Sequence, residues 1–179
     1  MGRLVGKRIA VLVEQQYQEL EVWYPALRFR EEGAEVVFVA PEANKVYPSK
    51  TGYPARSDAA VTEVNAADFD AIVIPGGFAP DFMRRHDAMI DFVRDAAEQG
   101  KVIGAICHGV WMLCSTPALR GKKATSFFAI RHDVMNAGAE WVDEEVVRDG
   151  NIITSRKPDD LPAFCRCIMD ALVPAAATA

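Results

Sequence analysis

The chain has 179 residues, of which 50% are hydrophobic and 25% are charged, and its formal net charge at pH 7 is −5. This length suits one well-buried core and is too short for two ordinary domains. An acidic chain offers no positive field to phosphate backbones, which argues against nucleic-acid binding. No apolar run is long enough to span a bilayer, and the N-terminal residues lack a signal-peptide pattern. We therefore expect one cytoplasmic domain that acts on a small molecule or a peptide.

The first part of the chain alternates apolar runs with helical patterns. Residues 9–13 are aliphatic throughout, as in a central strand that is covered on both faces. A helix is expected over about 19–32 and a second strand over 35–40. The stretch 41–60 is irregular, and a short hairpin is expected in it around Lys50-Thr51-Gly52-Tyr53. This order of elements favours a parallel α/β sheet.

Two features of this part lie where strands end. Glu21 is one turn into the first helix, close to the carboxyl end of the first strand, where ligands bind in doubly wound sheets. The alternative for Glu21 is a solvated helix charge. The strand expected over 69–74 ends at Pro75-Gly76-Gly77. Two glycines there can point successive N–H groups at one spot and form an anion nest, although a plain glycine turn has the same sequence.

The next helix is expected to run from Pro80 to Gly100, with apolar residues at helical spacing. Asp81 lies in its first turn, where an acidic residue commonly caps the helix and interacts with its dipole. On the sequence alone, capping is the role that we assign to Asp81.

A short stretch in the middle of the chain has the form of a nucleophile elbow. Residues 102–106 predict a buried strand and residues 110–114 a buried helix, which places Cys107 on the tight turn between them. Ala105-Ile106-Cys107-His108-Gly109 has small residues on both sides of the cysteine, as an elbow requires when the backbone reverses. We therefore select Cys107 as the candidate nucleophile.

The elbow predicts a reactive thiol. An exposed cysteine at a helix N-terminus can have its pKa lowered from about 8.5 into the range of about 3.5 to 7.5. The alternative is a buried structural thiol. The other cysteines, Cys114, Cys165 and Cys167, show no disulfide spacing, so all four are expected to be reduced. We expect no metal site at Cys165 and Cys167, because side chains two residues apart on a helix point to different sides.

The C-terminal part continues the α/β pattern. A strand is expected over 124–127, a helix over 131–137, and a hairpin over 145–154 that turns at Asp-Gly. A closing helix begins near Pro158, and residues 173–179 are expected to form a disordered tail. The fold class is therefore α/β: a single-domain, flavodoxin-like, three-layer sandwich, mostly parallel, with helices on both faces and a nucleophile elbow.

Several segments, in this order, resemble the ThiJ/PfpI superfamily over residues 7–172. They are Ile9 to Val13, Glu21-Val22-Trp23-Tyr24-Pro25, Phe69 to Gly77, Ala105 to Gly109, Asn136 to Trp141 and Thr154 to Leu161. Cys-His at the elbow, together with the long signature from Gly138 to Leu161, is similar to the PfpI branch of intracellular proteases, glyoxalases and protein deglycases.

The resemblance implies roles for six residues. Cys107 is the nucleophile, and Glu21 donates a hydrogen bond from a protonated carboxyl to its thiolate. The backbone of Gly76 and Gly77 forms the oxyanion hole, and His108 moves protons. In this branch a glutamate at the position of Asp81 reaches across a subunit interface to the histidine; aspartate is one methylene shorter.

The same resemblance implies a function without cofactor or metal. Cys107 would act on a small carbonyl substrate, a glycated protein or a peptide, as a deglycase, a glyoxalase or an intracellular peptidase in the stress response. The chain would self-associate as a dimer or a dimer-based hexamer. Phe127 and Phe128 stand where many relatives have tyrosine or histidine, and would form an apolar pocket wall. The alternative is a non-enzymatic oxidation sensor or redox-regulated chaperone that uses the same cysteine.

Overall fold

A computed structural model describes residues 2–173 of the protein. Its strands are β1 (Arg8–Leu12), β2 (Glu35–Ala40), β3 (Val46–Pro48), β4 (Pro54–Arg56), β5 (Ala59–Ala60), β6 (Ala71–Ile74), β7 (Val102–Ile106), β8 (Lys123–Ala124), β9 (Glu140–Trp141), β10 (Val146–Asp149) and β11 (Ile152–Ser155). Its α-helices are α1 (Glu19–Glu31), α2 (Ala79–Met83), α3 (Asp87–Glu98), α4 (Val110–Cys114), α5 (Arg131–Asn136) and α6 (Leu161–Leu172).

The main sheet has the strand order β10-β11-β7-β6-β1-β2-β5. Every neighbouring pair is parallel except β10 and β11. In the centre of the sheet, Ile9 of β1 pairs with Val36 of β2 on one side and with Ala71 of β6 on the other. Residues 9–13 are completely buried, because helices cover both faces of this strand. The predicted mostly parallel sheet is confirmed.

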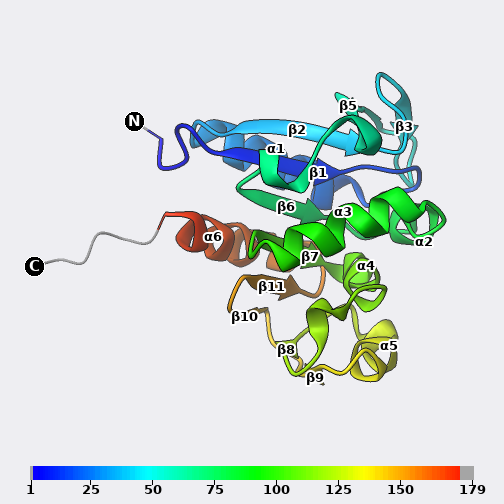
Figure 1. The fold of residues 1–179 in the computed structure, drawn as a ribbon, viewed down its shortest axis with the longest axis vertical. Helices are drawn as coiled ribbons and strands as arrows, with labels where there is room; N and C mark the ends of the chain where they lie inside the picture. The colour runs from blue at the N-terminus through cyan, green and yellow to red at the C-terminus, as the bar shows by residue number, and fades with distance from the viewer. Residues whose placement is uncertain (1, 174–179) are drawn as a thin grey trace, which may run out of the picture.

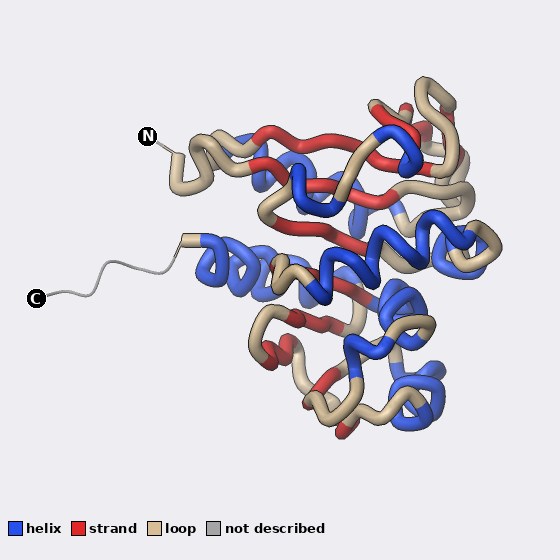
Figure 2. Tube along the Cα trace, in the orientation of Figure 1, coloured by secondary structure: helices blue, strands red, loops and turns tan. Residues whose placement is uncertain are grey.

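Helices pack on both faces of the sheet. Helices α1 and α6 contact each other and cover one face, whereas α3 covers the other face (Figure 1). Figure 2 shows the same layers, with the strands in red between helices in blue. Gly104 allows α6 to lie close to β7, because a Cβ at this position would be 2.8 Å from the ring of Phe164. The predicted three-layer α/β sandwich is confirmed.

The parallel strands β1, β6 and β7 lie side by side, so their carboxyl ends meet at one edge of the sheet. Glu14, Pro75 and Cys107 follow these three strands closely. Segments that are far apart in the sequence thereby come together at this edge, which is where doubly wound sheets bind ligands.

Both predicted hairpins are present. In the C-terminal hairpin, Val146 pairs with Ser155 and Asp149 with Ile152, and the turn residue Gly150 has a φ of +64°. Near Lys50, β3 and β4 form an antiparallel pair. The strand expected over 124–127 is shorter than predicted, because only Lys123–Ala124 pairs with β9.

The prediction of one long helix from Pro80 to Gly100 is wrong. The structure has α2 and α3 in its place, separated at His86, whose φ of −116° and ψ of 106° are extended. Helical spacing of apolar residues continues across this break, since both helices bury a face against the same core. The periodicity therefore could not reveal the interruption.

The packed domain extends slightly beyond the predicted limits of 7 and 172. Leu4 is completely buried, and its N–H donates to the carbonyl of Glu32 at 2.8 Å. Val173 caps α6 by donating to the carbonyl of Met169 at 2.9 Å. The rest of the predicted tail, 174–179, lies outside the described residues. Among residues 2–173, no helix combines the length and the apolar character needed to cross a membrane.

Candidate active site

Cys107 follows β7 directly and has a φ of +60°, a left-handed conformation that is uncommon for a residue other than glycine. It opens one 3-10 turn, Cys107–Gly109, which leads into α4. Small residues are needed here for steric reasons, because a Cβ at Gly109 would collide with the carbonyl oxygens of Ile74 and Pro75 on the neighbouring strand. The predicted nucleophile elbow is therefore present in the backbone geometry.

Glu21 reaches the elbow from the first turn of α1 and is completely buried. Its Oε2 accepts a hydrogen bond from the N–H of Gly76 at 2.7 Å. Gly76 lies between the carboxyl and the cysteine: a Cβ there would be 2.7 Å from Glu21 Oε2 and 2.8 Å from Cys107 Cβ. Glycine is thus required for the carboxyl and the thiol to approach each other. The side-chain oxygen of Gln18 caps α1 by accepting from the N–H of Glu21 at 3.0 Å.

The carboxyl of Glu21 is protonated at neutral pH. Burial raises its pKa to about 8, and this effect outweighs the opposing hydrogen bonds from Gly76 and Cys107 and the attraction of Lys50. Its Oε1 has no hydrogen-bond partner within the described part of the chain, although it is buried. A protonated carboxyl with a free oxygen beside the sulfur can donate a hydrogen bond to it, as the resemblance implied.

The expectation of an exposed thiol with a low pKa is wrong. Cys107 is only 8% exposed, and burial, with the charge of Glu21 second, raises its pKa to about 12. The backbone N–H groups of His108 and Gly77 interact with the sulfur and lower the pKa, but by less. The helix dipole is weak here because α4 has only five residues. Deprotonation of Cys107 therefore needs a base close to the sulfur.

The imidazole of His108 is close enough to the sulfur to act as such a base. Its Nδ1 lies 3.4 Å from Cys107 Sγ. Burial and the charge of Lys50 lower the pKa of His108, so the imidazole is neutral at pH 7 and can accept a proton at Nδ1 when its own proton is on Nε2. The ring packs against Trp111 and Phe127, with ring centroids 5.1 Å and 5.0 Å away. These aromatic contacts hold the imidazole beside the sulfur.

The two glycines of the predicted oxyanion hole have different roles in this structure. The N–H of Gly76 is already used in the hydrogen bond to Glu21. The N–H of Gly77 interacts with the sulfur, and so does the N–H of His108. Gly77 has a φ of +75° and forms an isolated bridge with Tyr17, which fixes its orientation. A developing oxyanion would therefore meet the N–H groups of Gly77 and His108.

Cys107 opens into a cavity of about 240 Å³, below the range of about 300 to 1,000 Å³ that is usual for ligand sites. Its size suits a small substrate. Phe127 lines the wall, as expected from the sequence, and Phe128 lines an adjoining cavity. Two further lining residues, Lys50 and Lys157, were missed by the sequence analysis. A signal for Lys157 existed, since it follows the carboxyl end of β11, a parallel strand beside β7.

Asp81 is not part of this cavity in its own chain. It lies on α2 with 53% of its side chain exposed, and it forms an ion pair with Arg85. Asp81 does not cap α2 either. The N-cap residue is Phe78, and no side chain makes a capping hydrogen bond there. The action of Asp81 across a subunit interface stays a prediction.

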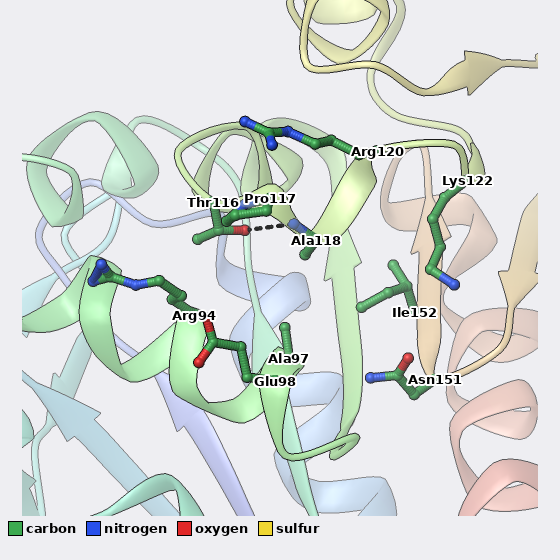
Figure 3. A pocket seen from close by; sticks show the side chains of 10 residues that line it. All are labelled: Arg94, Ala97, Glu98, Thr116, Pro117, Ala118, Arg120, Lys122, Asn151 and Ile152. Carbon is green, nitrogen blue, oxygen red and sulfur yellow. Dashed lines mark hydrogen bonds between the residues drawn. The ribbon is translucent and has the colours of Figure 1, made fainter.

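A second cavity, of about 250 Å³, lies at the opposite edge of the sheet. Asn151 and Ile152, at the amino end of β11, form one side, and Ala97 and Glu98 of α3 form another (Figure 3). No cysteine or histidine lines it. It therefore contains no thiol or imidazole.

All four cysteines are free, and Cys165 is only 1% exposed inside α6. The part of the chain that the structure describes holds no cluster of three or more histidine, cysteine or acidic side chains that could bind a metal ion. The groups that line the Cys107 cavity include the thiol, the carboxyl, the imidazole, backbone N–H groups and the side chains of Lys50 and Lys157.

Fold and site together define a class: α/β proteins that carry a cysteine on a nucleophile elbow, with a protonated carboxyl beside it. The chain belongs to the DJ-1/PfpI family, whose family model matches residues 7–171.

Two similar proteins with names that state an activity are both deglycases. The chain is similar to protein/nucleic acid deglycase 2 of Escherichia coli (strain K12), with 43% identity over 164 residues that cover 90% of this chain and 95% of the relative. It is 42% identical to deglycase PfpI of Pyrococcus furiosus over 159 residues, which cover 89% of this chain and 95% of that relative.

Among solved structures, the chain is similar to a two-domain protein of Anabaena variabilis that contains DJ-1/ThiJ/PfpI-like and ferritin-like domains. The TM-score is 0.91 at 46% identity, and the match covers 93% of this chain and 48% of that one. This chain therefore spans about half of that protein.

Proposed function

We propose that the protein is a cofactor-independent enzyme in which Cys107 attacks the carbonyl carbon of small reactive aldehydes and of their adducts on amino groups. The observation that carries the proposal is the pairing of an elbow thiol with a neutral imidazole 3.4 Å away. The deglycase names of the relatives support the same class of reaction.

The first step forms the S–C bond. As Cys107 Sγ attacks, its proton passes to His108 Nδ1, and the carbonyl electrons move to the oxygen, which the N–H groups of Gly77 and His108 stabilise. A neutral Glu21 does not repel the electrons that gather on sulfur and oxygen. The imidazolium of His108 then returns the proton to this oxygen, which gives a neutral hemithioacetal.

An α-oxoaldehyde then rearranges within the cavity. The hydrogen on the former aldehyde carbon leaves as a proton, and a proton returns to the neighbouring carbon, so that the first carbon is oxidised to a thioester and the second is reduced to an alcohol. Water cleaves the thioester, which releases a hydroxy acid and restores the thiol. With a hemiaminal adduct on an amino group, the sulfur displaces the amine from the former aldehyde carbon: the S–C bond forms as the C–N bond breaks, the amine leaves with a proton, and the same hemithioacetal results.

The small cavity supports small carbonyl substrates better than an extended peptide. The oxidation sensor is less well supported, because a thiol that is 8% exposed with a raised pKa has little thiolate to react with peroxide. We also propose a cytoplasmic location, where the four free cysteines would stay reduced.

Self-association is part of the proposal. The hydrogen bond to Cys107 Sγ is the only one that the His108 side chain makes within residues 2–173. No carboxylate in this part of the chain therefore fixes the orientation of the imidazole ring. Asp81 is exposed and available to a second subunit. We propose a two-fold dimer in which Asp81 of the partner subunit orients His108.

The test is turnover of methylglyoxal to lactate, with Cys114→Ser as the matched control variant. We expect turnover by wild type and by Cys114→Ser, and none by Cys107→Ser. Full activity of Cys107→Ser would refute the proposed nucleophile. A wild-type protein without turnover, whose Cys107 is nevertheless oxidised first by mild peroxide, would favour the sensor.

A further inference from the structure

The charges around the Cys107 cavity are unevenly distributed. Two lysines line it: Lys50, from the turn between β3 and β4, and Lys157, which follows β11. The only acidic residue among its lining residues is Glu21, which is completely buried. The cavity thus combines two cations with one carboxyl that is shielded from solvent.

Lys50 is held in place by the segment that carries the site. Glu19 Oε1 accepts hydrogen bonds from the hydroxyl of Ser49 at 2.5 Å and from the N–H of Thr51 at 2.9 Å, on either side of Lys50. The N–H of Lys50 itself donates to the carbonyl of Tyr17 at 3.0 Å. These contacts tie the turn to the residues just before Glu21. The position of Lys50 is therefore built into the site.

The ammonium group of Lys50 is available to a ligand. Its Nζ lies 5.7 Å from the centroid of the Phe78 ring and forms no ion pair with any described residue. The carboxylate of Glu19 accepts hydrogen bonds from Ser49 and Thr51 and stays ionised, but it forms no ion pair with Lys50. Lys50 thus lines the cavity as a cation without a direct ion-pair partner within residues 2–173.

Lys157 adds a second cation on the other side. Its Nζ is 3.3 Å from Asp159, but that carboxylate is 82% exposed, and such surface pairs contribute little. The neighbouring Arg156, in contrast, is held by Asp143 and Asp160 and is not free for a ligand. Lys157 also lines the adjoining cavity, and the two cavities share Phe127 as a lining residue.

The other ionisable groups of the cavity do not cancel this charge at pH 7. Burial raises the pKa of the Glu21 carboxyl and of the Cys107 thiol, so both stay protonated. Burial lowers the pKa of His108, so its imidazole stays neutral. Lys50 lowers the pKa of both Glu21 and His108, whereas the charge of Glu19 raises that of Glu21.

We infer that the Cys107 cavity selects carbonyl compounds that carry a carboxylate, which Lys50 and Lys157 bind while the aldehyde carbon lies at the sulfur. This inference rests on the proposed function. It names the substrate class as anionic α-oxoaldehydes and their adducts, in preference to neutral ones of the same size.

Alkylation of Cys107 tests the charge preference without requiring turnover. Iodoacetate and iodoacetamide react alike, since sulfur displaces iodide and the thiol proton goes to solvent, but only iodoacetate is anionic. The alkylation rates at Cys107 are measured by peptide mass mapping. For each variant, the ratio of the iodoacetate rate to the iodoacetamide rate is compared with the same ratio for free 2-mercaptoethanol. We expect wild type to favour iodoacetate by about tenfold over this reference, which one charge-assisted hydrogen bond can provide.

Lys50→Gln and Lys157→Gln should each reduce this preference, and the double variant should abolish it; the ratio of the two rates cancels any change in thiol reactivity that both reagents share. Lys45→Gln is the matched control, because Lys45 lies in the same hairpin region but pairs with Glu42 away from the cavity. A wild type without preference, or a double variant that retains it, would overturn the inference.

Turnover of 4,5-dioxopentanoate and of its neutral amide, 4,5-dioxopentanamide, provides the second arm. We expect kcat/KM to be about tenfold higher for the carboxylate in wild type and equal for both compounds in the double variant. If neither compound is turned over but the alkylation preference depends on the lysines, the proposed function fails and the anion site stands. Equal turnover of both compounds by wild type would overturn the preference and leave the proposed function intact.

Discussion

Replacing Glu21 by glutamine should lower the pKa of the Cys107 thiol. Glu21, with a pKa of about 8, loses its proton before Cys107, whose pKa is about 12. The thiol of the wild type therefore titrates beside a carboxylate that opposes a second negative charge. Glutamine has the same shape and no charge, so this repulsion disappears in Glu21→Gln.

The size of the effect follows from Coulomb's law. Two unit charges about 4 Å apart interact by ~4 kcal/mol at an effective dielectric constant of about 20. Because one pH unit corresponds to about 1.36 kcal/mol, this limits the decrease in the thiol pKa to about 3 pH units. Burial, the larger cause of the raised pKa, stays in place. The thiol of the variant should thus titrate no lower than an ordinary cysteine.

The assay follows thiolate absorbance or the iodoacetamide rate as a function of pH, in a background where Cys114, Cys165 and Cys167 are serine or alanine. Glu31→Gln is the matched control, because it removes the same charge from the last turn of the same helix, where Glu31 pairs with Arg28. An unchanged or higher thiol pKa in Glu21→Gln would refute the electrostatic contact between Glu21 and Cys107.

Two further predictions concern stability and assembly. The folded state binds the Glu21 proton between the ordinary glutamate pKa of 4.5 and about 8, so the unfolding free energy of wild type should fall as pH rises through this window, by up to about 5 kcal/mol. Urea unfolding at pH 5 and pH 8 checks this, because Glu21→Gln should lack that decline; parallel profiles would contradict a raised pKa. Cys107→Ala and Asp81→Ala should each be inactive, and their co-expression should restore roughly a quarter of wild-type activity through mixed dimers with one intact site. A co-expressed pair that stays inactive, or an active Asp81→Ala, would rule out a role for Asp81 across the interface.

The elbow could be predicted because its requirements are local. Ala105 and Gly109 flank Cys107 at fixed spacing in one short stretch. The aliphatic run at residues 9–13 and the Asp149-Gly150 turn likewise have short-range signals. The sheet, its layers and the backbone geometry of the elbow therefore followed from residue patterns and from the resemblance.

The electrostatics of the site could not be predicted in the same way. The pKa of Cys107 depends on burial, on the charge of Glu21 and on the backbone N–H of Gly77, and these two residues come from segments distant from Cys107. The use of the Gly76 N–H by Glu21 requires the exact position of α1 relative to β6. Lys50 enters the cavity through a turn whose anchoring to Glu19 has no sequence pattern. Long-range packing decides all three.

The central claim, covalent attack by Cys107 on a carbonyl carbon, is tested most directly by rapid acid quench of the enzyme with methylglyoxal, followed by peptide mass mapping. The account predicts a transient mass increase of one methylglyoxal on the peptide that contains Cys107, formed and lost at the rate of turnover, and absent in Cys107→Ser. Turnover with the Cys107 peptide unmodified at every time point, or an adduct that forms only on another residue, would contradict it.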